Sequence, residues 1–337
     1  GRLSAQSKTL ANQIAQFDAQ IRLTTLKISQ TEEKIALLGG RIDQLEVSLD
    51  ALSNAFSSRA VETYKMVRVG DAFLILISAP DLTGAVSRFH YLQKIQEADR
   101  DLLSRLQAAQ ITYQGEKTDQ ETLQKELGIQ KANLNSQKAA KANLLAATKN
   151  DEKNYQKLLS EARAQLAALK RFVVGQGGAS ILNNQTKCDG WGCYYNQRDS
   201  LWGNMGMGCS SYSVAEYGCL ITSVSMIASH YGKNIKPSDI AANSNFFVPG
   251  TGYLYHSAEG MPFSLTSVSK DSLDSELNNG PVIAGLYDGP DHFIVILRKE
   301  GSNYIIHDPF MPDGGNRPLT DKYSVSDITS LRLVRFN

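Results

Sequence analysis

A long heptad pattern constrains the first part of the chain more than any other feature. Between Leu10 and Phe56, apolar residues recur at alternating steps of four and three, and Thr24 and Thr31 fill the two gaps. A heptad kept over roughly six repeats is typical of a coiled coil, because the apolar stripe of a globular helix is wider. The apolar positions of this seam are Leu10, Ile14, Phe17, Ile21, Ile28, Ile35, Leu38, Ile42, Leu45, Leu49, Leu52 and Phe56.

A second helical run extends from about Val86 to about Phe172. Its seam is more polar, with Asp99, Glu116 and Lys141 at or near seam positions. Because one chain supplies both runs, we expect them to pair as an antiparallel hairpin, and a long parallel dimer is the alternative. Residues 1–172 are therefore predicted to form an all-α coiled-coil domain.

Residues 64–92, between the two runs, break the heptad and form the predicted tip of the hairpin. Gly70, Pro80 and Gly84 interrupt continuous helix, and the apolar residues around them are too many for a solvated loop. They are expected to form a small core that closes the tip, or a docking surface for a partner, and the two roles are compatible. The candidate docking residues are Phe73, Leu74, Leu76, Ile77, Leu82 and Phe89.

The composition changes after Phe172. Residues 173–187 are rich in Gly, Asn, Gln and Ser, which predicts a flexible linker. Residues 188–337 contain short apolar runs that suit strands and are predicted to form an α+β domain.

With 35 Lys and Arg against 34 Asp and Glu, the chain lacks the basic excess expected of a nucleic-acid-binding protein. No apolar run approaches the length of about 20 residues that crosses a membrane.

The stretch from Tyr217 to Gly232 places Cys219 in the first turn of a predicted short helix. Unpaired backbone N–H groups and the helix dipole favour a thiolate at such a position, which would make Cys219 a good nucleophile. The simpler interpretation is a small buried cysteine. The choice between the two depends on the surrounding residues.

His292 and Asp308 are the candidate partners of this cysteine. They lie on two apolar runs joined by a polar turn near Glu300, which predicts a hairpin with His292 directly opposite Asp308. Asp308 would then hold the imidazole and fix its tautomer, as a cysteine nucleophile requires. Gln197, which precedes Cys219 in the chain, is the candidate donor to an oxyanion, together with the Cys219 backbone N–H.

The other three cysteines are Cys188, Cys193 and Cys209. They allow one disulfide, whose pairing the sequence leaves open. Zinc binding by these three and a histidine is an alternative, but no second pair at ligand spacing follows. No metal or cofactor is therefore expected.

Several stretches in the second half resemble papain-like cysteine peptidases, in the branch related to the bacteriocin-leader peptidase domains of bacterial exporters. They are YYNQRDSLWGN, YGCLITSVSMIASHYG, GPVIAGL, HFIVI and IIHDP. The resemblance implies an α+β papain-like fold in which Cys219 is the nucleophile, His292 the general base and acid, Asp308 its orienter and Gln197 the oxyanion donor. The family commonly has Gly-Pro after the cysteine, where this chain has Leu220 and Ile221.

Residues 57–106 are similar to the hairpin end of division-associated coiled-coil proteins typified by PcsB, EnvC and CwlO. This resemblance implies an FtsEX-like membrane complex as partner of the tip, an extracytoplasmic location at the division septum, and peptidoglycan peptides as substrate. The alternative is a non-catalytic adaptor whose peptidase-like domain binds peptide or activates a separate wall hydrolase. Given the long helical part, we also expect that one of its segments covers the active site.

Overall fold

The computed structural model describes residues 9–69 and 79–337 of the chain. Its first helices are α2 (Leu10–Val69) and α4 (Leu82–Thr148). Two compact units are present: Arg22–Leu134 forms one, and Asn135–Asn337 forms the other together with the start of α2 up to Ile21. The candidate docking residues Phe73, Leu74, Leu76 and Ile77 lie outside the described residues.

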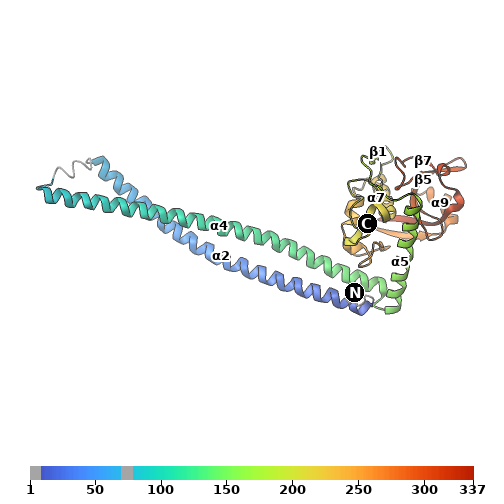
Figure 1. Ribbon diagram of the computed structural model, residues 1–337, viewed down its shortest axis with the longest axis horizontal. Coiled ribbons are helices and arrows are strands. Elements are labelled where there is room, and N and C mark those ends of the chain that lie inside the picture. Colours follow the sequence, from blue (N-terminus) through green and yellow to red (C-terminus); the bar gives the residue numbers. More distant parts are fainter. Residues whose placement is uncertain (1–8, 70–78) are drawn as a thin grey trace. The chain divides into compact units, whose positions relative to one another are not determined.

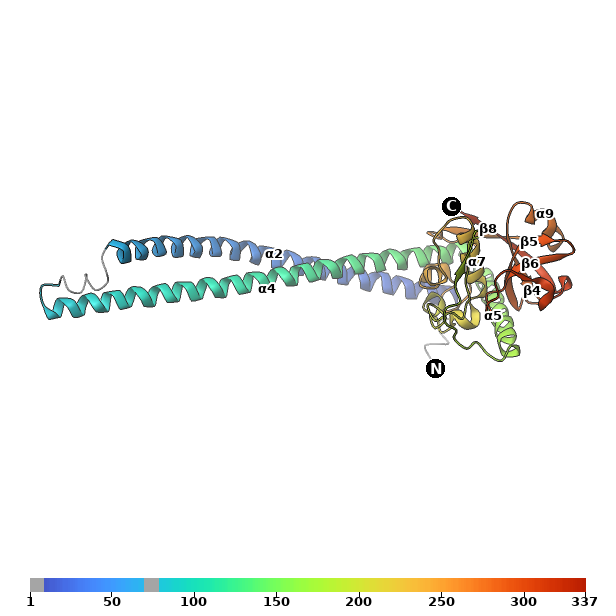
Figure 2. The same ribbon diagram turned by 90° about the horizontal axis from the view of Figure 1, so that it is seen from above.

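Within Arg22–Leu134, α2 and α4 run side by side in opposite directions (Figure 1). The amine of Lys131 lies 2.8 Å from the carboxylate of Glu32, whereas Arg59 contacts Asp99, nearer the other end of both helices. Residues late in α4 therefore contact residues early in α2. Figure 2 shows the same pairing from above.

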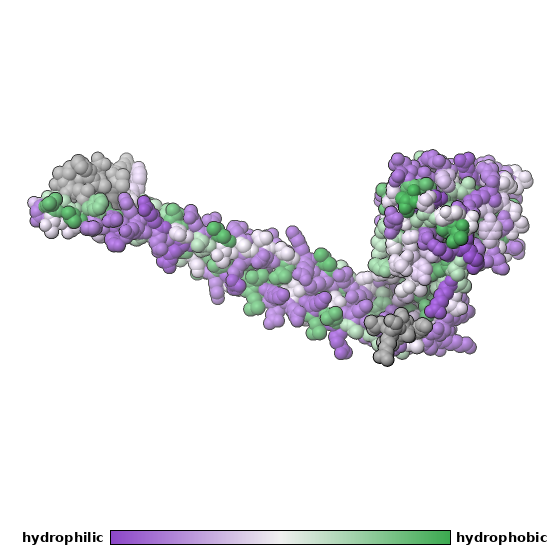
Figure 3. Space-filling view, viewed as in Figure 1, coloured by the Kyte–Doolittle hydropathy of each residue, from purple (hydrophilic) through white to green (hydrophobic). Residues whose placement is uncertain are grey.

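The heptad positions of α2 face this pairing. From Ile28 to Phe56 they are buried or half-buried, whereas the apolar side chains of Leu26, Leu37 and Val47, which lie off the seam, are more than half exposed. Figure 3 accordingly shows hydrophobic residues as separate small patches among hydrophilic ones along the two helices.

The polar residues of the seam have specific partners. The Thr31 hydroxyl donates to the side-chain oxygen of Gln130 over 3.1 Å, and the Arg41 guanidinium pairs with Glu116. These contacts offset part of the cost of burying Thr31 and Glu116, although the second carboxylate oxygen of Glu116 has no hydrogen-bond partner among the described residues.

The second helical run is not continuous, contrary to the prediction. After α4 ends at Thr148, Lys149 and Asn150 adopt left-handed backbone conformations with φ of 52° and 53°, and a separate helix, α5 (Glu152–Gly175), begins. The carboxylate of Asp151 accepts a hydrogen bond from the Asn154 N–H and caps the new helix. Heptad counting misses such a break because apolar residues recur on both sides of it.

Helix α5 packs on the sheet-containing domain through one face. Its buried residues are Tyr155, Leu159, Ala162, Leu166, Ala168, Leu169, Phe172 and Val173. The segment predicted as a flexible linker also lies against this domain: the Leu182 N–H donates to the Arg198 carbonyl over 2.8 Å, and the Arg198 guanidinium donates to Ser180. Both segments therefore belong to one compact unit with the sheet.

A six-stranded antiparallel sheet organises this domain, in the order β3-β8-β4-β5-β6-β7. Its strands are β3 (Phe263–Val268), β4 (Val282–Leu286), β5 (His292–Glu300), β6 (Asn303–His307), β7 (Arg317–Pro318) and β8 (Ile328–Phe336). A small second sheet pairs β1 (Lys187–Cys188) with β2 (Cys193–Tyr194). The remaining helices are α6 (Val214–Tyr217), α7 (Cys219–His230), α8 (Pro237–Ala241) and α9 (Leu273–Leu277), with short 3-10 turns at Met207–Cys209, Ser244–Phe246, Lys270–Ser272, Leu319–Asp321 and Val325–Asp327.

Both faces of the central strands are covered. Phe293 and Val295 of β5 belong to the core that includes α7, whereas Ile294 and Ile296 pack with residues such as Leu273 of α9. This explains why β4 and β5 read as continuous apolar runs rather than as alternating patterns. No helix in the described part of the chain is long and apolar enough to cross a bilayer.

Candidate active site

Cys219 is the first residue of α7, as predicted, and its side chain is buried. The backbone N–H groups of Phe293 and Leu220 hydrogen-bond to its sulfur. Gly218 lies between α6 and α7, where a Cβ atom would come within 2.5 Å of the Val214 carbonyl oxygen. Only glycine therefore allows the tight junction that places Cys219 at the start of the helix.

His292 and Asp308 meet in the structure. The His292 Nε2 atom lies 2.7 Å from Asp308 Oδ1, and both side chains are almost completely buried. The other ring nitrogen, Nδ1, is thereby left for proton exchange with a reacting group. The adjacent residue, Phe293, supplies the N–H that hydrogen-bonds to the Cys219 sulfur, so the strand of the histidine also contacts the nucleophile.

The register of the hairpin differs from the prediction. Val295 pairs with His307, a bulge lies between Ile296 and Arg298, and Asp308 follows the end of β6. Asp308 is therefore not directly opposite His292. It reaches the imidazole diagonally, a separation that side chains on one face of a sheet can bridge.

Asp308 is held as a carboxylate by several donors. The Phe310 N–H donates to Oδ1 over 2.8 Å, and the Tyr323 hydroxyl donates to Oδ2 over 2.7 Å. Burial acts to raise the pKa of Asp308, but the His292 imidazole and these hydrogen bonds outweigh burial and lower the pKa to about 2. The carboxylate is thus charged at any working pH and can stabilise an imidazolium.

Gln197 connects the segment that follows Asp308 to helix α6, which precedes Cys219. Its backbone N–H donates to the Pro309 carbonyl, next to Asp308, and its side-chain amide donates to the Ala215 carbonyl of α6, each over 2.8 Å. One amide hydrogen remains for an oxyanion. Its side-chain oxygen is buried without a hydrogen-bond partner among the described residues, so the amide is held mainly through its nitrogen.

Helix α5 covers the histidine. The Phe172 ring stacks on the His292 ring with a centroid distance of 4.1 Å and an interplanar angle of 5°. The Gln165 amide donates to the Pro290 carbonyl over 2.6 Å, and Arg171 lies 3.2 Å from Asp291, just before the histidine. These contacts fix the end of α5 on the loop that leads into β5.

The same helix fills a groove beside the nucleophile. Only about 20 Å³ of open space remains there, room for about one water molecule but not for a peptide. Leu166 and Leu169 of α5 meet Leu220 and Ile221 of α7 in this groove. The structure therefore represents a closed state of the site.

The closed state changes the chemistry of the thiol. Burial raises the pKa of Cys219 to about 12, and the hydrogen bonds from the Phe293 and Leu220 N–H groups offset this only in part. The expectation that the helix N-terminus alone would favour a thiolate is therefore wrong for this state, because desolvation outweighs the helix end. The thiol is therefore protonated at neutral pH in this state.

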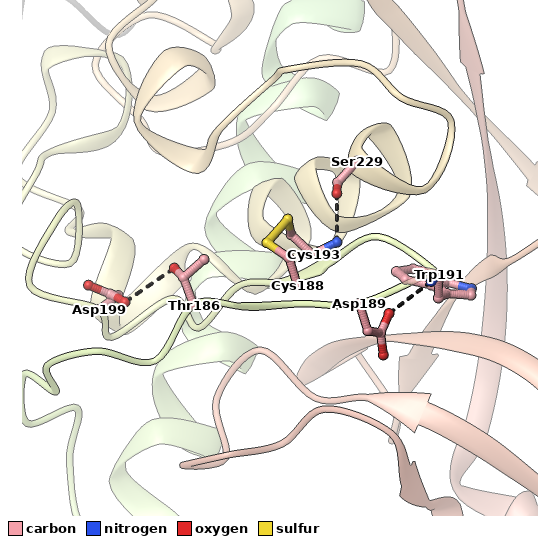
Figure 4. Close-up of a disulfide and its surroundings, with 7 residues drawn as sticks. All are labelled: Thr186, Cys188, Asp189, Trp191, Cys193, Asp199 and Ser229. Atoms are coloured by element: carbon pink, nitrogen blue, oxygen red, sulfur yellow. Dashed lines mark hydrogen bonds between the residues drawn. A yellow bond between two sulfur atoms is a disulfide. The ribbon is translucent and has the colours of Figure 1, made fainter.

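The other cysteines leave Cys219 free. Cys188 and Cys193 form a disulfide across β1 and β2, while Cys209 and Cys219 are free thiols. Figure 4 shows the disulfide next to Ser229, whose hydroxyl accepts the Cys193 N–H. In the parts of the chain that the structure describes, no group of His, Cys, Asp and Glu is arranged to hold a metal ion.

A separate cavity of about 380 Å³ lies beside the disulfide. It is lined by Asp189 and by His307, whose Nδ1 accepts the Asn316 N–H over 2.9 Å. Burial lowers the pKa of His307 to about 4, so this imidazole is neutral at neutral pH. His307 thus packs apart from the His292–Asp308 pair, as the sequence predicted.

Tyr323 and Phe172 are the site residues that sequence reasoning missed. Tyr323 follows Asp308 by a loop and a strand without any motif that connects them, and Phe172 was counted as the end of a coiled coil. The one available signal was the apolar stripe of α5, which continues to Val173, just before the Gly-rich segment.

The sheet-containing domain follows a helical first part and carries Cys219 at the start of a helix and the His292–Asp308 pair on the sheet. This arrangement indicates a papain-like cysteine peptidase domain. Residues 210–322 match the model of the Peptidase C39 family. This range contains Cys219, His292 and Asp308, and it supports a cysteine peptidase. No curated protein and no solved structure matches the chain.

Proposed function

We propose that this protein is a cysteine peptidase whose catalytic residues are Cys219, His292, Asp308 and Gln197. The observation that carries the proposal is the buried 2.7 Å hydrogen bond between His292 and Asp308, on the strand whose Phe293 N–H contacts the Cys219 sulfur. A base held by a buried carboxylate next to a thiol at the start of a helix is the arrangement that nucleophilic acyl transfer requires.

The reaction follows from these roles. Once its proton has passed to His292, the Cys219 sulfur forms a bond to the carbonyl carbon of the substrate, while Gln197 and the Cys219 N–H stabilise the oxyanion. His292 then gives its proton to the leaving amine as the C–N bond breaks, which leaves a thioester. Water, deprotonated by His292, attacks this thioester and releases the acid and the thiol.

We further propose that the enzyme acts outside the cytoplasm on peptidoglycan peptides during cell division. The Cys188–Cys193 disulfide supports an oxidising compartment. The paired helices are proposed to form an antiparallel coiled-coil hairpin, whose tip binds an FtsEX-like membrane complex. Leu82 and Phe89 near this tip are 82% and 55% exposed, as residues available to a partner should be.

A non-catalytic adaptor is the second candidate function. It is favoured by the closed groove and by the buried, protonated thiol of Cys219. In the enzyme proposal, the same features describe a resting state that opens when α5 leaves the groove. The two candidates therefore differ in whether Cys219 ever cleaves a bond.

Purified cell-wall sacculi distinguish the two. We expect the full chain to release soluble peptides that mass spectrometry identifies, and Cys219→Ala to release none. Cys209→Ala, which removes the other free thiol, should behave as the wild type. If the wild type and Cys219→Ala release equal amounts of peptide, the enzyme proposal is wrong.

A further inference from the structure

Arg332 occupies an unusual position next to the candidate active site. It lies on β8, where it pairs with Ile283 of β4, and its guanidinium sits over the Phe293 ring, 4.5 Å from the centroid. Phe293 is the residue after His292 and the donor to the Cys219 sulfur. Phe293 therefore contacts both Arg332 and Cys219.

This arginine also lines the groove that α5 fills. Its neighbours on the groove wall are mainly apolar, including Leu220, Ile221 and Leu254. The side chains that α5 inserts here are Gln165, Leu166 and Leu169, which carry no charge. The groove thus combines apolar walls with a single guanidinium.

No carboxylate pairs with Arg332 among the described residues, and the groups that interact with its charge are Tyr253 and the Cys219 thiol. Among the described residues, its guanidinium forms neither an ion pair nor a hydrogen bond, whereas the more exposed Arg171 and Arg298 pair with Asp291 and Glu300. Burial lowers the pKa of Arg332, which reflects the cost of removing the ion from water. A guanidinium in such a place normally has an acidic or polar partner.

We propose that Arg332 binds a carboxylate of the peptide substrate in this groove once α5 has left it. The inference rests on the proposed peptidase function and adds a substrate class, namely peptides that carry a carboxylate close to the scissile bond. The planar guanidinium matches a carboxylate through two parallel hydrogen bonds. The apolar walls would hold the adjoining side chain and exclude water from the pair, which strengthens it.

A carboxylate in a peptide has two sources, an acidic side chain or a free C-terminus, and one experiment covers both. A mixed peptide library, read by mass spectrometry, gives the cleavage sites of the full chain. Matched peptides with Glu or Gln next to the scissile bond, and with a free or amidated C-terminus, are then compared by kcat/KM. We expect at least a tenfold preference for the carboxylate form, mainly through KM. The amide form of the peptide would leave the Arg332 guanidinium without a charged partner in a groove that excludes water.

Variants of the full chain test the role of Arg332 itself. Arg332→Met should reduce the preference to less than about twofold, and Arg332→Lys should keep part of it. Arg335→Gln, which changes an exposed arginine of the same strand, should leave it intact. The melting temperature of Arg332→Met should stay equal or rise, because a half-buried charge without an ion-pair partner is removed, whereas a purely structural arginine would lower it.

The outcomes separate this inference from the proposed function. Cleavage without any preference for a carboxylate, or a preference that survives in Arg332→Met, overturns the inference and leaves the peptidase intact. If neither the library nor sacculi are cleaved, the peptidase proposal is wrong and the inference fails with it.

Discussion

The two carboxylate oxygens of Asp308 have different partners, and this asymmetry orients the His292 imidazole. Oδ1 accepts from His292 and from the Phe310 N–H, while Oδ2 accepts only the Tyr323 hydroxyl among the contacts that the structure describes. We therefore infer that Tyr323 is a positioning residue, because its hydroxyl binds Asp308 and its ring lies beside the His292 ring, with 6.4 Å between the centroids.

We predict that Tyr323→Phe lowers kcat/KM roughly tenfold, the usual effect of one lost hydrogen bond to a charged group. Without this donor the charged form of Asp308 is less stable, so its pKa rises from about 2 and the acidic limb of the pH–rate profile moves to higher pH. The pH–rate profiles of the variant and the wild type check this.

Tyr304→Phe is the matched control, because the Tyr304 hydroxyl also donates to a carboxylate, that of Asp274, over 2.7 Å but away from the site. An acidic limb that is unchanged in Tyr323→Phe, or shifted equally in Tyr304→Phe, would contradict the positioning role.

Sequence patterns pointed to the candidate catalytic residues but not to the groups that contact them. Cys219 was found from a local helix pattern, and His292 with Asp308 from a hairpin pattern, since both depend on neighbours in the sequence. The turn between β5 and β6 lies at Gly301 and Ser302 rather than at Glu300, which shifts the register, and the bulge in β5 offsets only one residue of this shift. Tyr323 and Arg332 reach the site through tertiary packing, which a single sequence does not encode as a motif.

At the scale of elements, α5 is the helix that covers the candidate site. The helix is capped by Asp151, contacts the loop before His292 through Gln165 and Arg171, and stacks Phe172 on the imidazole. In the sequence alone, the apolar face of α5 looks like a continuation of the coiled coil. The left-handed backbone of Lys149 and Asn150, just before the helix, makes α5 a separate element.

We predict that Phe172→Ala speeds alkylation of Cys219 by iodoacetamide at pH 7.5 at least tenfold. Removing the stacked ring lets water reach the site, so the pKa of the thiol falls from about 12 and its thiolate fraction at neutral pH rises. Mass spectrometry of the modified protein measures the rate at each cysteine.

Two further variants control for loss of folding, because Phe→Ala at a buried position typically costs about 3–5 kcal/mol. Phe172→Leu keeps much of the apolar contact and should give an intermediate rate. Val174→Ala, at a position that is 65% exposed on the same helix, should leave the rate unchanged. Equal rates in all four proteins would show that α5 does not close the site.

At the scale of the whole molecule, the pairing of α2 with α4 explains how one chain uses two long apolar seams. The predicted seam of α2 is the face that is buried, which shows how far periodicity alone can predict a long helix. The break before α5 and its packing on the sheet domain were not predictable in this way, since they depend on contacts between segments far apart in the sequence.

We predict that the two helices pair within one chain. With Cys209 changed to Ser, Glu32→Cys and Lys131→Cys together should be linked by a short bismaleimide into a product of monomer size, because these residues form an ion pair across the helices. Glu32→Cys with Lys94→Cys, which lies elsewhere on α4, is the control and should not link within the chain. Covalent dimers from both pairs would instead indicate a parallel dimer.

The most direct test of the account is the reactivity of Cys219 towards a peptide that carries a thiol-reactive ketone, followed by intact mass and peptide mapping. We expect one adduct, on Cys219, that forms faster in Phe172→Ala and is at least a hundredfold slower in His292→Ala, while Asp308→Asn gives an intermediate rate. Labelling of Cys209 at the same rate as Cys219, or a Cys219 rate that does not depend on His292, would contradict the assignment of these residues as a catalytic unit.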